Sequence, residues 1–525
     1  MAKAAQQGKM KLNYPKTILT GFGFMATSIA WQLYDPYITK ILDRFLSASP
    51  LVAEWSQRLA GSSFLARFME SQGEEAFIAG RFTLVPLFIG IIMTFDNIFG
   101  VIFQPYFGKL SDRCHSRWGK RRPFIFIGAP ISALLFLMIP LMGTLPMAMV
   151  FIILFVFVMS LWRSPVVALM PDLTPPELRS EGNAVINLMG GAGGVIGMVA
   201  GTVVTMVYLA MKGITKDSPL FDEFSTFPAV FAVGSVIMIV CMFVLMFFVK
   251  EKDSRILNAD VLAARNEEER KAAEKEAKRL DKLERKEQKL SKPERRSLIA
   301  MLGGLFFLFC GANAIQTFFA LFAAEILHRD TAQATLLMLV FAVFMMISAL
   351  PAGKLGKKIG RKKTIMLGLG TFLGAFVVFF IVLIAMLGGN GLTIGEFWRT
   401  NAVDPTNPAV ASVIKFLGVL IFPVLAIAGV GNMMITVNTL PLVLEIGGQE
   451  KLGTFTGYYY TATFSAQIAS PIVYGFYRMF SGTYLSLFYY SPIMFALAFL
   501  CIMIVKHGEA IPDEIIKEIE AENAD

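Results

Sequence analysis

The chain has 525 residues, of which 55% are hydrophobic and 17% are charged, and its mean hydropathy is +0.61. A soluble protein of this length needs a larger polar surface, so this composition excludes a soluble globular protein. Many apolar runs exceed about 18 residues, enough for a helix to cross a hydrocarbon core roughly 30 Å thick. We therefore expect a helical membrane protein, in which the net charge of +9 reports topology rather than binding to nucleic acid.

The predicted elements, in chain order, are twelve membrane spans. The first apolar segment is too long for the core of a signal peptide, and we interpret it as a retained span. Most of the later segments are bounded by charged residues, Pro or Gly. The twelve spans cover residues 17–42, 83–107, 123–143, 147–171, 183–210, 227–250, 297–326, 332–352, 364–388, 411–444, 453–478 and 485–506.

The spans divide into two groups of six, which predicts an all-α membrane protein built from two pseudo-symmetric six-helix bundles. Residues 1–250 form the first bundle and include a long loop, 43–81, whose amphipathic stretches predict one or two short helices. Residues 298–525 form the second bundle. Between them, residues 251–297 are highly charged and rich in helix formers. We interpret this segment as a solvated helical linker, with a regulatory or partner-binding helix as the alternative.

Lys and Arg are concentrated on one side of the predicted membrane. They precede the first span and crowd the loops after spans two and eight, and loops rich in these residues stay in the cytoplasm. The sequence therefore predicts cytoplasmic termini, an outer position for loop 43–81, and a plasma or inner membrane location. The residues are Lys3, Lys9, Lys11, Lys16, Lys109, Arg113, Arg117, Lys120, Arg121, Arg122, Lys354, Lys357, Lys358, Arg361, Lys362 and Lys363.

The sequence motif of the loop after the second span is repeated in the second bundle. It reads GKLSDRCHSRWGKRRPF from Gly108, and the loop after the eighth span reads GKLGKKIGRKKTI from Gly353. Both begin Gly-Lys-Leu and continue to a Gly with a basic run. Repeated halves in a membrane bundle are typical of alternating-access transporters, whose substrate site lies between the halves.

The longer string QPYFGKLSDRCHSRWGKRRPFI, residues 104–125, resembles a signature loop of the major facilitator superfamily. It is similar to the branch of plant sucrose transporters and their bacterial and animal relatives, with the glycoside–pentoside–hexuronide cation symporters as more distant kin. ALMPDLTPPELRSEGNAV, residues 168–185, also resembles the sugar-carrier segment that joins spans four and five. The resemblance implies the fold of that superfamily and the transport of a sugar.

The resemblance also implies a gate. In the superfamily, the acid of this loop pairs with basic residues and a neighbouring helix end and holds the cytoplasmic side shut; carried over, that acid is Asp112. Arg offers two-pronged geometry for such a pair. Topological anchoring by a positive loop is the alternative, but it does not explain the acid, and the second loop lacks one. The candidate partners are Arg113, Arg117, Arg121 and Arg122.

Few ionisable residues lie inside the predicted spans, where each costs roughly a few kcal/mol to insert and is therefore a functional candidate. Asp35 lies in the first span, Asp96 in the second and Arg163 in the fourth. An apolar setting favours the neutral form of a carboxyl and a nearby Arg favours the charged form, so these residues could couple proton or cation movement to transport. A structural Arg–Asp pair is the alternative, and Asp35 before Pro36 could instead mark a kink.

Departures from the relatives bear on the coupling ion. The sodium-coupled melibiose-type relatives have two acids four residues apart in the second span, where this chain has Gly100 and Gln104. The missing acids favour the proton. The sucrose carriers have an Arg in the fourth span where this chain has Val167; Arg163 lies one helical turn away on the same face and could serve instead.

Polar side chains elsewhere in the spans could line a sugar site, because sugars bind through hydrogen bonds to amides and carboxylates and through contacts with aromatic faces. Hydrogen bonding between helices is the alternative for each of them. The candidates are Gln32, Asn97, Asn313, Gln316, Asn432, Asn438, Tyr458 and Gln467.

These observations favour a proton-coupled symporter of a disaccharide or other glycoside, working as a monomer without cofactor or metal. The sugar and membrane lipids are the expected partners. A superfamily exporter of drugs, lipids or metabolites is one alternative, and a membrane scaffold or sensor that acts through the charged linker is another. An enzyme is not expected, because neither a nucleophile–base set nor a metal cluster is apparent.

Overall fold

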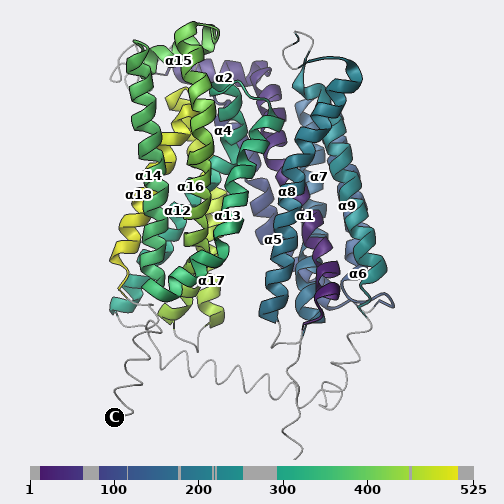
Figure 1. The fold of residues 1–525 in the computed structure, drawn as a ribbon. Helices are drawn as coiled ribbons and strands as arrows, with labels where there is room; N and C mark the ends of the chain where they lie inside the picture. The colour runs from purple at the N-terminus through teal and green to yellow at the C-terminus, as the bar shows by residue number, and fades with distance from the viewer. Residues whose placement is uncertain are drawn as a thin grey trace, which may run out of the picture.

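The computed structural model describes residues 12–62, 82–114, 116–174, 179–215, 218, 221–251, 292–447 and 452–506. All regular structure in these residues is helical, as predicted, and they contain no β-strand. Figure 1 shows two groups of long helices standing side by side, one from each half of the chain.

The helices of the N-terminal half follow the predicted spans. They are α1 (Tyr14–Ser47), α2 (Pro50–Ala60), α4 (Val85–Met93), α5 (Phe95–Asp112), α6 (Arg122–Met138), η1 (Ile139–Leu141), α7 (Leu145–Leu173), α8 (Arg179–Lys212), η3 (Glu223–Thr226) and α9 (Phe227–Phe248). The second predicted span is broken into α4 and α5 at Thr94, whose hydroxyl donates a hydrogen bond to the carbonyl of Ile91 (2.6 Å). A Thr hydroxyl bonded back to its own helix favours a bend, and the bend lies two residues before Asp96.

The helices of the C-terminal half are α12 (Lys292–Ile326), α13 (Thr331–Ile359), α14 (Arg361–Gly389), α15 (Ile394–Val403), α16 (Pro408–Gly447), α17 (Leu452–Ser481), η5 (Tyr484–Ser486) and α18 (Leu487–Ile504). α15 is not predicted from the sequence. Its start is stabilised by a capping box, in which Thr393 Oγ1 accepts from Glu396 N (3.2 Å) and the Glu396 carboxylate accepts from Thr393 N (2.7 Å).

The loops and the linker are described in part. α2 confirms a short helix in the predicted outer loop, and Figure 1 shows it at the same end of the molecule as α15. The rest of that loop, residues 63–81, lies outside the described residues. α12 begins at Lys292, inside the segment predicted as linker. Residues 252–291 of the linker, and residues 175–178 of the segment that follows α7, also lie outside the described residues.

Ten helical segments in the described part of the chain are long and apolar enough to cross a membrane. α1 and α17 have 34 and 30 residues but are not among the ten, because Thr, Ser, Gly and other polar residues interrupt their apolar runs. The prediction of a polytopic helical membrane protein is confirmed, and ten of the twelve predicted spans meet these criteria.

Each half packs around its own aromatic core. In the N-terminal half the rings of Phe136 and Phe231 stack with their centroids 4.3 Å apart. In the C-terminal half Phe379 and Phe488 stack at the same distance. The halves also pack against each other at the seam, where the rings of Phe82 and Phe480 meet edge-on with centroids 6.1 Å apart.

The two ends of the molecule differ in how the halves meet. We call the end at which α5 and α13 finish, at Asp112 and Ile359, the basic end, and the opposite one the α2 end. Toward the α2 end, α4 and α17 approach so closely that a Cβ atom on Gly90 would overlap the carbonyl group of Pro471. Small residues allow such backbone contact between membrane helices.

Candidate functional site

A cavity of about 390 Å³ lies at the seam between the two halves. The N-terminal half contributes Gln32, Asp35 and Pro36 of α1 and Met198 of α8. The other walls are formed by α12, α13, α14, α16 and α18, and most of their lining side chains are apolar. A ligand in this cavity would contact both halves at once.

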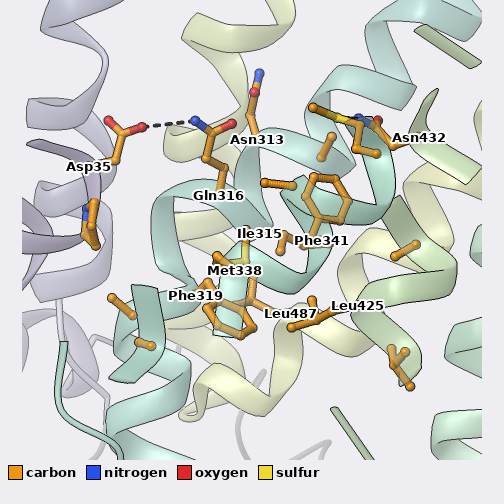
Figure 2. Close-up of a pocket in the computed structure, with 18 of the residues that line it drawn as sticks. Asp35, Asn313, Ile315, Gln316, Phe319, Met338, Phe341, Leu425, Asn432 and Leu487 are labelled. Atoms are coloured by element: carbon orange, nitrogen blue, oxygen red, sulfur yellow. Dashed lines mark hydrogen bonds between the residues drawn. The ribbon is translucent and has the colours of Figure 1, made fainter. Parts of the chain in front are cut away.

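Five of the predicted site residues line this cavity: Gln32, Asp35, Asn313, Gln316 and Asn432. Gln316 Nε2 donates a hydrogen bond across the seam to Asp35 Oδ2 (3.1 Å), as Figure 2 shows. Asn432 Nδ2 contacts Met345 Sδ (3.2 Å), and sulfur is a weak acceptor. The Nδ2 of Asn313 is buried and has no hydrogen-bond partner.

The other predicted lining residues lie elsewhere. Asn438 is 3% exposed, and its amide donates to the carbonyls of Ala352 (3.3 Å) and Met434 (2.8 Å). It therefore ties α16 to α13, which is the alternative stated for it above. Tyr458 is exposed on α17, where its ring meets Phe455 edge-on, and Gln467 is half-buried on the same helix.

Asp96 lies in the first turn of α5 and is not among the residues that line the cavity. Its Oδ1 accepts hydrogen bonds from the backbone N (2.6 Å) and Nδ2 (2.8 Å) of Asn97. Asn97 thus supports Asp96 instead of lining the cavity. Asp96 also interacts electrostatically with both Asp35 and Arg163. The three ionisable residues predicted from the sequence therefore form one electrostatic group.

Arg163 does not form a direct ion pair with Asp96 among the described residues; its guanidinium lies 5.5 Å from the ring centre of Trp31. Trp31 meets Tyr34 edge-on, with ring centroids 5.3 Å apart. Trp31 Nε1 and the Tyr34 hydroxyl are buried without hydrogen-bond partners. Neither residue is predicted as functional from the sequence, although both fall within one turn of Asp35.

At the basic end, Arg121 is the centre of a charge cluster. Its side chain is 7% exposed and bonds to Asp112 Oδ1 and Ser111 Oγ, while its Nε donates to Asp172 Oδ2 (2.8 Å). Burial by itself would lower the pKa of Arg121, but hydrogen bonds and attraction from Asp172 and Asp112 raise it above its usual value. Arg121 therefore stays charged.

Asp112 pairs with Arg121, whereas Arg113 and Arg117 are exposed and Arg122 donates to the carbonyl of Met246. Asp172 and Glu251 complete the cluster and are not predicted from the sequence. Glu251 accepts hydrogen bonds from the backbone N of Lys120 (2.8 Å) and of Arg121 (3.0 Å). These bonds join the ends of α5, α6, α7 and α9, which all belong to the N-terminal half.

At the α2 end, polar contacts join the two halves. Glu223 Oε2 accepts hydrogen bonds from the backbone N (3.0 Å) and hydroxyl (3.2 Å) of Thr331 at the start of α13. Lys40 pairs with the same carboxylate (3.2 Å). The hydroxyl of Thr202 on α8 donates to the carbonyl of Ala332 (3.0 Å). A second cavity, of about 330 Å³, lies at this end and is lined in part by charged residues of both halves.

Comparisons with known proteins bear on the site. A sequence model of the Major Facilitator Superfamily matches residues 17–471, and a further match covers residues 301–521. A sucrose transport protein, SUC3, of Arabidopsis thaliana is 26% identical over 191 residues, 31% of each chain. A membrane-associated transporter protein of Homo sapiens is 28% identical over 129 residues, 22% of this chain and 24% of that one. The matched segments thus span less than a third of either relative.

Two solved structures share the fold. A D-xylose–proton symporter gives a TM-score of 0.55 at 14% identity, covering 93% of this chain and 96% of the other. The nucleoside transporter NupG gives 0.54 at 13% identity, covering 93% of this chain and 100% of the other. At such low identity the likeness shows the fold alone.

Replacing Arg121 by Lys tests the cluster at the basic end. Lys keeps the charge but lacks the planar fork that bonds two carboxylates at once, so we expect the free energy of unfolding to fall by about 1–3 kcal/mol. Thermal unfolding of the purified protein measures this loss. Arg117→Lys, at an exposed position in the same loop, is the matched control. Equal stability of the two variants would contradict a central role for Arg121.

Proposed function

The chain belongs to the major facilitator superfamily and is a membrane transporter, and we propose that it moves a disaccharide or other glycoside together with a proton by alternating access. In this proposal α1 and α17 cross the membrane with the ten apolar segments, and both termini lie in the cytoplasm beneath a plasma or inner membrane. The observation that carries the proposal is the cavity at the seam of the halves with Asp35 on its wall. The matched Arabidopsis relative is named for sucrose transport, which supports a sugar as the substrate.

Proton coupling is supported by the position of Asp35. A charged acceptor forms the stronger hydrogen bond, so protonation of Asp35 would weaken its bond to Gln316 across the seam. The charge on Asp35 is also felt by Asp96. A proton that binds to this pair therefore changes both the ligand wall and the contact between the halves, which is what coupled transport requires.

Alternating access is supported by the contrast between the two ends. Glu223 of the N-terminal half holds the first turn of α13 in the C-terminal half, so these bonds must break before the halves can separate at the α2 end. The Arg121 cluster bonds helices that belong to one half. It would keep the ends of these helices together while the half moves as a unit.

The second candidate function is export of an apolar metabolite, lipid or drug, which the apolar walls of the cavity favour. Counterflow in proteoliposomes separates the two candidates. Liposomes loaded with an unlabelled glycoside should take up the labelled compound transiently if the protein carries sugars. Counterflow of apolar compounds alone would favour the exporter.

Replacing Asp96 by Asn tests proton coupling. A gradient of one pH unit is worth about 1.4 kcal/mol per proton, so the wild-type protein should accumulate a transported glycoside up to about tenfold. The Asp96→Asn variant should only equilibrate it, while exchange of labelled for unlabelled glycoside continues. Asp222→Asn, a change at an exposed acid on the surface, should accumulate the glycoside normally. Tenfold accumulation by Asp96→Asn would contradict this role.

Replacing Glu223 by Ala tests closure at the α2 end. Loss of two charge-assisted hydrogen bonds to Thr331 should favour opening there by about tenfold. A cysteine introduced at Thr83, which lines the second cavity, should then react about tenfold faster with a membrane-impermeant thiol reagent. Glu54→Ala, on the exposed face of α2, is the control. An unchanged labelling rate in Glu223→Ala would show that Glu223 does not hold this end shut.

A further inference from the structure

Helix α2 carries a stripe of exposed apolar side chains. Leu51, Trp55 and Leu59 recur every four residues and therefore share one face of the helix. They are 62%, 49% and 41% exposed. We propose that this stripe lies among phospholipids at the membrane interface, where headgroups meet hydrocarbon, and that α2 is an interfacial helix bound to lipid. The inference does not depend on which solute the protein transports.

The stripe is one of three faces of α2. Val52 and Ser56 lie on a second face, which is buried against the protein. The third face is exposed and mainly polar, with Glu54, Gln57 and Arg58. At about 100° per residue, the three faces follow one another around the helix. A helix with separate protein-facing, apolar and polar sides fits the place where protein, lipid and water meet.

The depth of α2 is fixed by its bond to the start of the next span. Ser56 Oγ donates a hydrogen bond to the carbonyl of Val52 (2.6 Å) and accepts one from the backbone N of Leu84 (3.1 Å). Leu84 directly precedes Val85, where an apolar segment long enough to cross a membrane begins. α2 therefore lies at the level where hydrocarbon begins, and Figure 1 shows it across the ends of the long helices. Trp is enriched at this level in membrane proteins.

The stripe continues onto the side of that span. The ring of Trp55 lies beside the ring of Phe88 on α4, with centroids 6.1 Å apart. Phe88 is half-buried, and Ile91, three residues further into the span, is 36% exposed. Residues three apart lie on the same side of a helix, so one apolar surface runs from α2 along α4. A partner on the stripe would also contact the side of a membrane span, which favours lipid over a soluble protein.

The charges of α2 indicate how lipid would be bound. Arg58 forms an ion pair with Glu54 one turn earlier, so the polar face beside the stripe carries no net charge. Attraction to anionic headgroups needs an excess of positive charge. The insertion of apolar side chains is then the source of binding, and phosphatidylcholine is a sufficient partner.

Nitroxide labels on the full-length protein in phosphatidylcholine vesicles test the inference. Leu51→Cys and Leu59→Cys would each be labelled in a background whose four native cysteines are replaced by alanine, with Gln57→Cys on the polar face as the control. Oxygen enters hydrocarbon, whereas a polar nickel chelate is excluded from it. We expect the ratio of oxygen to nickel collision rates to be about tenfold higher on the stripe than at Gln57. Added phosphatidylglycerol should leave this ratio unchanged.

Three other outcomes would overturn the proposal. Low collision rates with both reagents at Leu51 and Leu59 would show that protein covers the stripe, either another part of this chain or a second copy. A nickel collision rate equal to that at Gln57 would place the stripe in water. A high ratio found only with phosphatidylglycerol would show binding through charge instead of apolar insertion. Two positions on the stripe keep the test decisive if one variant fails to fold.

Discussion

The hydrogen bond from Gln316 to Asp35 joins the two halves at the wall of the seam cavity. A carboxylate inside a membrane bundle is costly unless it has partners or a function, and here its partner belongs to the opposite half. α1 brings Asp35 to the seam, and the field of that carboxylate reaches Asp96 on α5. A change in the charge of one side chain therefore acts on the ligand wall, on the seam and on a second acid together.

The two ends of the molecule use charge in different ways. At the basic end, Arg121 bonds to Asp112 and Asp172. Glu251 accepts a hydrogen bond from the backbone of Lys120, and Arg122 donates to the carbonyl of Met246. These bonds hold the ends of four helices of the N-terminal half together. At the α2 end, Glu223 reaches across to the other half. In this structure the loop that follows Asp112 connects helices of the N-terminal half only, and its role as a gate stays a prediction. The polar contact between the halves at the α2 end is made by Glu223 and Thr331, which lie outside the basic loop motif that begins at Gly108.

The fold follows from the sequence because long apolar runs leave few alternatives in a membrane. The break at Thr94 and the helix α15 could not be predicted in this way, because both depend on local hydrogen bonds and not on hydropathy. The site is only partly predictable. Asn313 and Asn438 are both amides inside apolar helices, yet one faces the cavity and the other bonds to a neighbouring backbone. Helix rotation and the identity of the packed neighbour decide between them. Nothing in the sequence distinguishes Glu223 and Asp172 from other acids near helix ends, because their partners Thr331 and Arg121 are distant along the chain.

The most direct test of coupling at Asp35 is the movement of protons during transport with no imposed pH gradient. Proteoliposomes with a trapped pH-sensitive dye would receive an external glycoside, and solute entry and internal pH would be followed together. Coupled transport requires the interior to acidify in step with solute entry in the wild-type protein, and Asp35→Asn to admit solute without acidification. Solute entry by the wild-type protein at constant internal pH would contradict a role for the Asp35–Asp96 pair in carrying the proton.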